Sequence, residues 1–526
     1  MGNRRAKGIL LAALVWLTIA GLLAVAAKVL ILPYFKKELD EETGSESIYQ
    51  QEVTIPADSF TGYCVLRSPL FKKLLRDEGI KLRIVDDNAA YEDRMKSLDR
   101  GDAQMAVFTI DSFIQAGAKL GKFPATVVLV IDETKGADAI VAYKESVKSL
   151  QDLDHTDASI VLTPDSPSEF LARTVIAHFN LPNLPAGWRQ GENGAAQVYR
   201  RFTADKGKGR KAYVLWEPYV SMALETPGAH LLLDSSKLRG YIVDVLVAER
   251  RFLRDHPDLV RAIVGAYLRA AYAYSQSPAM LYERVREDTN ETGSKDLSNS
   301  QIERLVNGIE WKNTLENFAY FGLLPAETAK GTQHLEEIFS NISDVLVKTG
   351  ALPEDPLQGK AHTLFYDGTL RQLQEEGFHP AKKVNIIQGI GAGTDELEPM
   401  HAGPSVQALT ETQWAELVPV ARMRVQPLSF ARGTARVHIQ SQRELDSLAQ
   451  KLASWPEYYL LITGHARAQG DPKANLKLAK ERAEAAASRL RQKGVDSNRI
   501  RTEAAPASGK TGEAQSVTFE LRQQPY

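Results

Sequence analysis

Residues 105–117 read MAVFTIDSFIQAG, and this stretch decides the class of fold that the sequence predicts. Met105–Phe108 is a short apolar run of the kind that forms a buried strand. Thr109–Ser112 follows this run and opens a helix, so polar side chains stand where the strand ends. Repeated strand-then-helix units of this kind predict an α/β fold.

The same alternation continues from about Thr54 to Phe378. Strands separated by helical stretches imply parallel βαβ units. Apolar residues recur at helical spacing after Pro257, so residues 258–350 should be mostly helical. The predicted strands are Lys81–Val85, Met105–Phe108, Thr126–Ile131, Ala139–Tyr143, Ser159–Thr163 and Ala212–Trp216.

The composition excludes several classes of protein. Apolar residues make up 44% of the 526 residues and charged residues 25%, which is ordinary globular usage and excludes a largely disordered or polytopic membrane protein. The net charge of −2 offers no broad basic field, so we expect no nucleic-acid partner. A single cysteine, Cys64, excludes an intrachain disulfide and a cysteine-based metal cluster, and we expect it to be a buried, unreactive thiol.

The amino-terminal segment predicts the compartment. Ile9–Ala27 is an almost uninterrupted apolar run, long enough to cross a bilayer as a helix, and the apolar character resumes to residue 32. Three basic residues precede it, which places the amino terminus in the cytoplasm. A cleaved signal peptide, with Ala24–Ala26 as its cleavage site, is the alternative, but the run is longer than a typical signal core. We therefore expect a single-pass anchor in a bacterial inner membrane, with most of the chain in the periplasm.

Several stretches of the central region carry a resemblance to a known family and occur in the order of that family. They are GYCVLRSPLF at 62–71, LDRGDAQMAVFTIDSFIQAG at 98–117, KGADAIVAYKESVKSLQDL at 135–153, VLTPDSPSEFLARTVI at 161–176, AYVLWEPYVSMA at 212–223, VDVLVAERRFLRDHPDLVRAIVGAY at 243–267 and GIEWKNTLENFAYFG at 308–322. Through these stretches the region resembles periplasmic substrate-binding proteins of the nitrate, taurine, alkanesulfonate and thiamine-precursor group, which serve ATP-binding-cassette (ABC) importers. This resemblance implies two α/β lobes that close on a small organic or anionic solute by hinge motion. It implies an ABC permease as partner.

Polar residues at strand ends are the first candidates for the ligand site, because open α/β sheets bind ligands there. Thr109 and Asp111 follow one predicted strand, and Ser166 and Ser168 follow another. Ser166 is a good N-cap and Glu169 completes a capping box, so these side chains serve either the helix alone or a ligand as well. Free backbone N–H groups at this helix start could bind an oxyanion. Negative charge at Glu169 and its neighbour Asp165 nevertheless weighs against a strongly anionic ligand.

The motif Trp216-Glu217-Pro218-Tyr219 is similar to a WEP-type motif of the family at the edge of the second lobe. Trp216 could stack on a planar ligand and Glu217 could accept from an amine, or they are a core tryptophan and an exposed acid. Asp138 lies where the resemblance places a crossover between lobes, as a cleft residue or a turn cap. The complete predicted ligand site is Tyr63, Thr109, Asp111, Asp138, Ser166, Ser168, Trp216, Glu217 and Tyr219.

The last hundred residues resemble the OmpA-like peptidoglycan-binding domain, through the stretch that runs from Val425 to Ile500. In that family an acid and an arginine hold the two charged ends of the diaminopimelate side chain. Here Arg467 stands at the position of the acid, while Asn475 and Arg482 match the pattern. Two bases facing a zwitterion leave its ammonium repelled, so peptidoglycan binding should be weak or absent. The alternative is that Arg482 is a surface arginine in a fold that no longer binds.

We find no HExxH, G-x-S-x-G or phosphate-loop pattern, and therefore expect no catalysis, no metal and no cofactor. The sequence predicts a membrane-anchored solute-binding protein for an ABC importer; the alternative is an envelope scaffold or ligand sensor that links the inner membrane and the cell wall. The predicted parts are a membrane anchor (1–35), a juxtamembrane linker (36–50), a two-lobed substrate-binding domain (51–385, second lobe about 142–232), a linker (386–415) and a small α+β OmpA-like domain (416–526).

Overall fold

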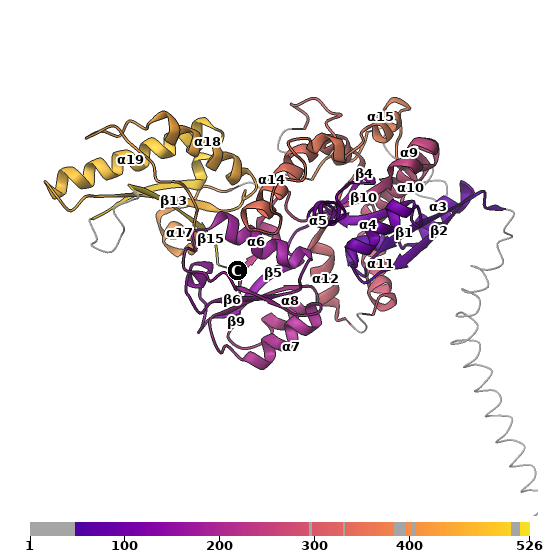
Figure 1. Ribbon diagram of the computed structural model, residues 1–526, viewed down its shortest axis with the longest axis horizontal. Helices are drawn as coiled ribbons and strands as arrows, with labels where there is room; N and C mark the ends of the chain where they lie inside the picture. The colour runs from indigo at the N-terminus through magenta and orange to yellow at the C-terminus, as the bar shows by residue number, and fades with distance from the viewer. Residues whose placement is uncertain are drawn as a thin grey trace, which may run out of the picture. The chain divides into compact units, whose positions relative to one another are not determined.

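A computed structural model of the chain describes residues 48–293, 297–329, 332–382, 396–401, 406–506 and 516–525 (Figure 1). The chain divides into two compact units. The smaller unit combines Met1–Glu52 with Arg76–Lys81, and in its described part the Gln50 amide donates to the Gly79 carbonyl at 2.8 Å. Strands β1 (Gln51–Ala57) and β2 (Ile80–Asp86) pair as a two-stranded sheet.

In the larger unit, the first lobe is built on a four-stranded sheet with the order β11-β4-β10-β3. These strands are β11 (Ile309–Trp311), β4 (Ala125–Thr134), β10 (Val243–Glu249) and β3 (Met105–Thr109). Every residue of β3, β4 and β10 is buried, because the sheet is covered on both faces. This burial explains why these strands are nearly continuous apolar runs.

The second lobe is a five-stranded sheet with the order β7-β6-β8-β5-β9. Its apolar core includes Phe202, Tyr213 and Val220, all buried. Helices α7 (Ala195–Asp205) and α8 (Tyr219–Leu224) supply two of these residues. The strands are β5 (Asp138–Tyr143), β6 (Ser159–Leu162), β7 (Arg189–Gly191), β8 (Lys211–Trp216) and β9 (Ala229–Asp234).

The predicted strands are all present, but the expected parallel βαβ units make up only part of the two lobes. In the described lobes, β6 pairs in parallel with β7 and β8, whereas β10 is antiparallel to both β3 and β4, and β5 is antiparallel to β8 and β9. The reason is that the chain crosses between the lobes twice, from β4 to β5 and from β9 to β10. Each strand that follows a crossover inserts into its sheet against the direction of its neighbours.

Helices surround both sheets, and the region after β10 is mostly helical, as predicted. Helix α10 (Pro257–Ser275) begins with the proline that the sequence suggested. The other helices of this region and of the lobes are α3 (Pro69–Asp77), α4 (Tyr91–Arg100), α5 (Ile110–Leu120), α6 (Pro167–His178), α9 (Arg250–Asp255), α11 (Pro278–Glu291), α12 (Asn299–Asn307), α13 (Thr314–Tyr320), α14 (Leu335–Lys348) and α15 (Gly368–Glu375), with the 3-10 turns η3 (Thr61–Cys64), η4 (Leu150–Leu153), η5 (Ser235–Lys237) and η6 (Ala361–Leu364).

The carboxyl-terminal segment is a four-stranded sheet of order β12-β15-β13-β14, against which the long helix α19 packs (Figure 1). Position 464 in β13 requires glycine, because a Cβ there would lie 1.9 Å from the carbonyl oxygen of Ala479 in α19. Gly494 follows α19 with φ of +92°, as a terminating glycine should. The elements are α17 (Glu411–Glu416), β12 (Val418–Arg422), α18 (Ile439–Ala453), β13 (Tyr459–His465), α19 (Pro472–Gln492), η7 (Ser497–Arg499), β14 (Ile500–Ala505) and β15 (Val517–Gln523).

Trp455 joins the carboxyl-terminal segment to the second lobe. Its side chain is fully buried, and its ring centroid lies 5.6 Å from that of His178, 5.3 Å from Phe179 and 6.1 Å from Tyr241. His178 ends α6, while Tyr241 lies in the crossover from β9 back to β10. The aromatic contact therefore reaches one of the two segments that connect the lobes.

The predicted anchor, residues 9–32, lies outside the described residues. Among the helices that the structure does describe, none combines the length and the apolar character needed to cross a membrane.

Candidate functional site

Three strands of the first lobe bring polar residues to the edge where the chain crosses to the second lobe. Thr109 ends β3, Asp132 lies near the end of β4, and Asp244 lies at the start of β10. In register, Asp244 is paired with Thr109 on one side and with Asp132 on the other. Because register partners on neighbouring strands lie about 5 Å apart, these residues form one polar row.

The second lobe presents a matching edge. Asp138 is the first residue of β5, and its register partner is Trp216, the last residue of β8. Strand β6 runs parallel to β8 and therefore ends at the same edge. This edge also carries Glu217 and Tyr219 after β8, and Ser166 and Ser168 after β6.

Asp132 and Asp244 form a buried carboxylate pair that the sequence reasoning missed. The hydroxyl of Tyr63, a predicted site residue, donates to Asp244. Burial raises the pKa of Asp132 to about 8, and burial with repulsion from Asp132 raises the pKa of Asp244 well above its usual value. Two such carboxyls are most stable when they share one proton. The signal in the sequence was an acid at the end of an otherwise apolar strand.

Asp111, in the first turn of α5, is fully buried and accepts no hydrogen bond on either carboxylate oxygen. The neighbouring hydroxyls of Thr109 and Ser112 bond to each other at 2.8 Å. Burial raises the pKa of Asp111 to about 7, although the nearby hydroxyls of Thr109 and Ser112 and the amides of Asp111 and Ser112 act in the opposite direction. These groups lie near the carboxylate without reaching hydrogen-bond geometry. A buried carboxylate without partners costs stability, so its presence needs a compensating role.

Asp138 is in a similar state in the second lobe. Burial raises its pKa to about 7, and the charges of Asp111 and Glu217 contribute to the shift. Glu217 is not the exposed acid of the alternative reading, since it accepts from the Ser221 hydroxyl at 2.7 Å and the Ser221 amide at 3.1 Å. Acids of both lobes therefore influence one another electrostatically across the crossover.

The two aromatic candidates are tied to the core of the second lobe. Trp216 is half-buried and packs with Tyr219 against that core, and the Tyr219 ring lies 5.8 Å from the Tyr199 ring. Trp216 thus retains an exposed part at the lobe edge while its remainder serves packing.

The start of α6 departs from the predicted capping box. The Ser166 hydroxyl donates to the Thr163 carbonyl at 2.7 Å instead of capping the helix. Glu169 accepts from the Asp165 amide at 2.9 Å and pairs with Arg189 at 2.7 Å. The capping box does not form because Glu169 accepts from the amide of Asp165 and not from the amide of the N-cap residue, Ser166. The Ser168 hydroxyl is fully buried and has no hydrogen-bond partner.

A groove of about 270 Å³ opens between the lobes next to these groups. Helices α4 and α5 line it from the first lobe, and Pro164 and Asp165 line it from the second. Lys119 spans the groove, with its Nζ 2.7 Å from Glu92 and 3.6 Å from Asp165. Ser112, which bonds to Thr109, lines the groove, but none of the predicted ligand-site residues does.

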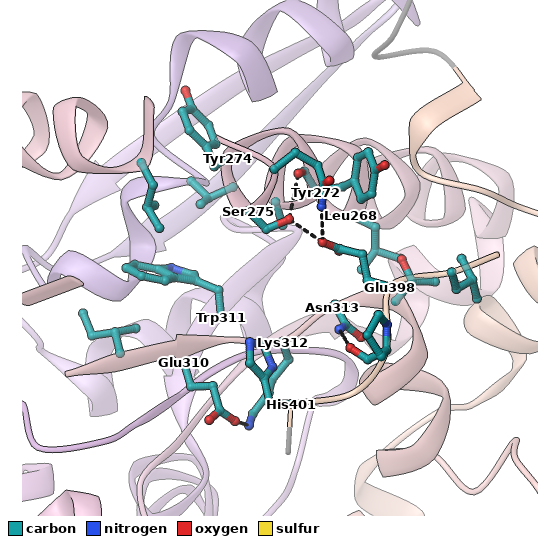
Figure 2. Close-up of a pocket in the computed structure, with 18 of the residues that line it drawn as sticks. Leu268, Tyr272, Tyr274, Ser275, Glu310, Trp311, Lys312, Asn313, Glu398 and His401 are labelled. Carbon is teal, nitrogen blue, oxygen red and sulfur yellow. Dashed lines mark hydrogen bonds and ion pairs between the residues drawn. The ribbon is translucent and has the colours of Figure 1, made fainter. Parts of the chain in front are cut away.

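A larger pocket of about 730 Å³ lies between α10, β11 and residues 396–401 (Figure 2), and one of its lining residues, Trp311, is the register partner of Asp132. Glu398 accepts from the Ser275 hydroxyl at 2.7 Å, and the Asn313 side chain donates to the Pro399 carbonyl at 2.9 Å. The segment 396–401 is thus held against the helical region and forms one wall of this pocket.

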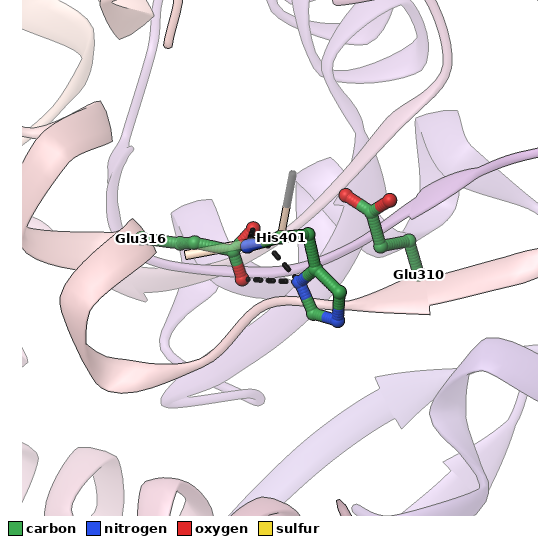
Figure 3. A group of neighbouring side chains, drawn as sticks. All are labelled: Glu310, Glu316 and His401. Atoms are coloured by element: carbon green, nitrogen blue, oxygen red, sulfur yellow. Dashed lines mark hydrogen bonds and ion pairs between the residues drawn. The ribbon is translucent and has the colours of Figure 1, made fainter. Parts of the chain in front are cut away.

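Glu310, Glu316 and His401 gather beside that wall, with one ligand atom of each within 4.8 Å of the others (Figure 3). The His401 Nδ1 lies 2.9 Å from both Glu316 oxygens. The ammonium of Lys312 pairs with Glu310 and lies 3.9 Å from Glu316. Because Lys312 already supplies the positive charge, we interpret the group as an ion-pair network and not as a metal centre.

The carboxyl-terminal candidates come together in space. The Asn475 side chain donates to the Arg467 carbonyl at 3.1 Å. Arg482 is buried, donates to the Thr434 carbonyl at 3.1 Å and lies over the Phe430 ring. Burial and the charge of Arg467 lower the pKa of Arg482, so the two arginines lie near enough to repel each other. Arg482 is therefore not the surface arginine of the alternative reading.

Comparison with protein families separates the chain into two matched regions. The NMT1/THI5 like family matches residues 72–280, and the OmpA family matches residues 429–517. The chain joins an NMT1/THI5-like segment to an OmpA family segment. The first segment contains most of both lobes, and the second contains Arg467, Asn475 and Arg482.

The curated relatives are peptidoglycan-associated lipoproteins that match a short stretch of the chain. The peptidoglycan-associated lipoprotein of Rhizobium meliloti (strain 1021) is 38% identical over 73 residues, which are 14% of this chain and 42% of that protein. The protein of the same name from Brucella melitensis biotype 1 is 36% identical over 73 residues, 14% of this chain and 44% of that protein. The chain therefore spans less than half of the length of these relatives.

Solved structures align with more than half of the chain at low sequence identity. The alkanesulfonate-binding protein SsuA from Xanthomonas axonopodis pv. citri aligns with a TM-score of 0.44 and 15% identity, over 60% of this chain and 98% of that chain. The periplasmic nitrate-binding protein NrtA from Synechocystis PCC 6803 aligns with a TM-score of 0.44 and 13% identity, over 64% of this chain and 90% of that chain.

Proposed function

We propose that this chain is a solute-binding protein of the cell envelope, which captures a small organic solute between its two lobes by hinge closure. One observation carries the proposal: the polar edges of the two sheets meet at the crossovers, and polar atoms of Asp111 and Ser168 there are buried without partners. A bound solute would satisfy such atoms, which otherwise cost free energy. The NMT1/THI5-like match over residues 72–280 supports this reading. The chain has no catalytic role in this proposal.

We further propose that the chain delivers its solute to an ABC permease, as the resemblance of its sequence to importer-associated binding proteins suggests. The apolar segment 9–32 would anchor it in the inner membrane. The OmpA family segment would face the cell wall, with affinity for peptidoglycan reduced by Arg467. Its similarity to peptidoglycan-associated lipoproteins supports placing it in the envelope.

The test is to purify the full chain without denaturant, release bound small molecules by unfolding it, and identify them by mass spectrometry. We expect a defined solute in near-stoichiometric amount. Trp216→Ala should reduce this amount, since loss of a stacked aromatic costs about 1 kcal/mol or more beyond burial. Tyr199→Ala is the matched control, because Tyr199 also packs against the core of the second lobe but is not one of the predicted site residues. A chain that never retains a small molecule contradicts the proposal.

A second candidate function is a ligand sensor or scaffold of the envelope. The observation that favours it is the packing of Trp455 against Tyr241, in a crossover between the lobes. A change in lobe closure would then move the crossover and, through Trp455, shift the OmpA family segment. The two functions differ in a measurable way: cells that lack an importer component lose uptake of the identified solute, whereas cells that lack a sensor keep it.

A further inference from the structure

The interlobe site is rich in acids that have few basic partners. Among the described residues, Glu217 has the guanidinium of Arg304 at 3.9 Å, while Asp111, Asp132, Asp138 and Asp244 form no ion pair. Asp111 and Asp138 come from opposite lobes, and like-charge repulsion between them contributes to the raised pKa of Asp138. Asp132 and Asp244 form a carboxylate pair at the same crossover. Glu217 adds a further acid on the edge of the second lobe.

The basic side chains around this site are already engaged. In the described chain, Arg94 pairs with Asp58 at 3.2 Å and with Asp87. Lys119 pairs with Glu92 and Asp165. Lys312 lies 3.3 Å from Glu133 and pairs with Glu310. An anionic solute would therefore find few positive groups that lack an acid beside them.

Both helix starts that face the site are also unsuited to an anion. A helix amino terminus attracts negative charge through its free N–H groups. Here the first turn of α5 carries Asp111 and the first turn of α6 carries Glu169, which accepts from the Asp165 amide. At both helix starts, a carboxylate of the protein already takes the place that an anionic solute would occupy.

Buried polar atoms without hydrogen-bond partners, one of them outside the group of acids, also point to a missing ligand. Both oxygens of Asp111 are buried without a hydrogen bond, and so is the hydroxyl of Ser168, which lies at the facing edge of the second lobe. Asp111 needs a donor and Ser168 can donate or accept, so a solute with N–H groups would satisfy both. Trp216, the register partner of Asp138, adds an aromatic surface that also favours cations.

We propose that the solute carries a cationic nitrogen group, an ammonium or an amidinium, held between Asp111 of the first lobe and Asp138 of the second. This inference rests on the proposed solute-binding function and names the chemical class of its ligand. Each lobe supplies one carboxylate, so the cation draws the lobes together on closure. Removing either carboxylate leaves the cation with a single charged partner and should weaken its binding.

The test is equilibrium dialysis of the full chain, first cleared of bound molecules, against a bacterial small-molecule extract. Matched probe pairs are added to the extract: putrescine with succinate, and benzamidine with benzoate. Mass spectrometry then identifies what the chain retains. The variants are Asp111→Asn and Asp138→Asn, which keep the shape and remove the charge. Asp102→Asn, which changes an exposed acid of the first lobe, is the matched control. Circular dichroism confirms that each variant is folded.

We expect the retained molecules to carry a cationic nitrogen, with Asp111→Asn and Asp138→Asn each weakening retention about tenfold or more and Asp102→Asn leaving it unchanged. Retention of anionic or neutral molecules alone would overturn the inference while leaving the proposed function intact. Undiminished retention of a cation by both asparagine variants would also overturn it. If the chain retains nothing from the extract or the probes, the proposed function fails, and this inference fails with it.

Discussion

Asp111 shows how one side chain can weaken the fold in which it serves. Its pKa is raised by burial to about 7, so between about pH 4 and pH 7 the folded chain holds a proton that the unfolded chain has lost. The free energy of unfolding therefore falls as the pH rises through this range. The raised values for Asp138, about 7, and Asp132, about 8, act in the same direction.

We predict that Asp111→Asn stabilises the full chain at pH 8, on the order of 2–4 kcal/mol, and has little effect at pH 4. Asparagine has nearly the same shape but carries no charge that must be buried. Urea unfolding of the parent and the variant at both pH values measures the effect. Asp102→Asn, at an exposed site, should change neither value. An equal effect at pH 4 and pH 8 would mean that charge is not the cause.

Arg467 carries the second prediction at this scale. The full parent chain should bind purified peptidoglycan sacculi weakly, and Arg467→Asp should increase the retained fraction, because the acid would pair with the ammonium that two arginines repel. Arg467→Ala separates relief of repulsion from restoration of the acid, and should give a smaller gain. Tight binding by the parent, with no gain in Arg467→Asp, would contradict this account of the site.

Among the elements, segment 396–401 depends on a titratable contact. The hydrogen bond with Glu316 raises the pKa of His401, with Glu310 acting in the same direction and Lys312 opposing it. Burial alone would raise the pKa of Glu316, but the hydrogen bond to His401 and the charge of Lys312 lower it. The contribution of His401 is therefore complete below pH 6.5 and is lost as the pH rises through its raised folded value.

We predict that segment 396–401 opens more readily at pH 8.5 than at pH 6. Hydrogen exchange of its amides, corrected for the intrinsic effect of pH, measures this opening. His401→Asn cannot titrate, so its protection should be independent of pH over the same range. Equal pH dependence in the parent and in His401→Asn would show that another group controls the segment.

At the scale of the molecule, Trp455 links the OmpA family segment to the second lobe and a crossover. Trp455→Ala should lower the free energy of unfolding by about 3–5 kcal/mol, since it removes a fully buried aromatic ring. Lys237→Ala removes only the half-exposed ion pair with Glu457 and should cost less than about 1 kcal/mol. Calorimetry of the full chain compares the two. If both variants lost a similar free energy of unfolding, the ion pair and not the aromatic packing would be the main stabilising contact.

For most residues of the candidate site, the sequence predicted that they lie at or just after the end of a strand. Thr109 and Trp216 end strands, Asp111 and Ser166 follow strands, and the ends of strands can be read from apolar runs. Asp132 and Asp244 could not be paired in this way, because each is an acid near the end of an apolar strand and the order of the chain does not show that the two strands are neighbours. Their significance comes from register, which places them on neighbouring strands of one sheet.

The sequence by itself determined where strands and helices form, since apolar spacing and helix-start residues are local signals. It also determined the two family resemblances and the exchange of acid for base at Arg467. Only the tertiary structure decided the direction of β5 and β10, the meeting of acids from both lobes, and the absence of partners for Asp111. These properties depend on contacts between residues far apart in the chain, and burial, which raises the pKa of each acid, exists only once those contacts have formed.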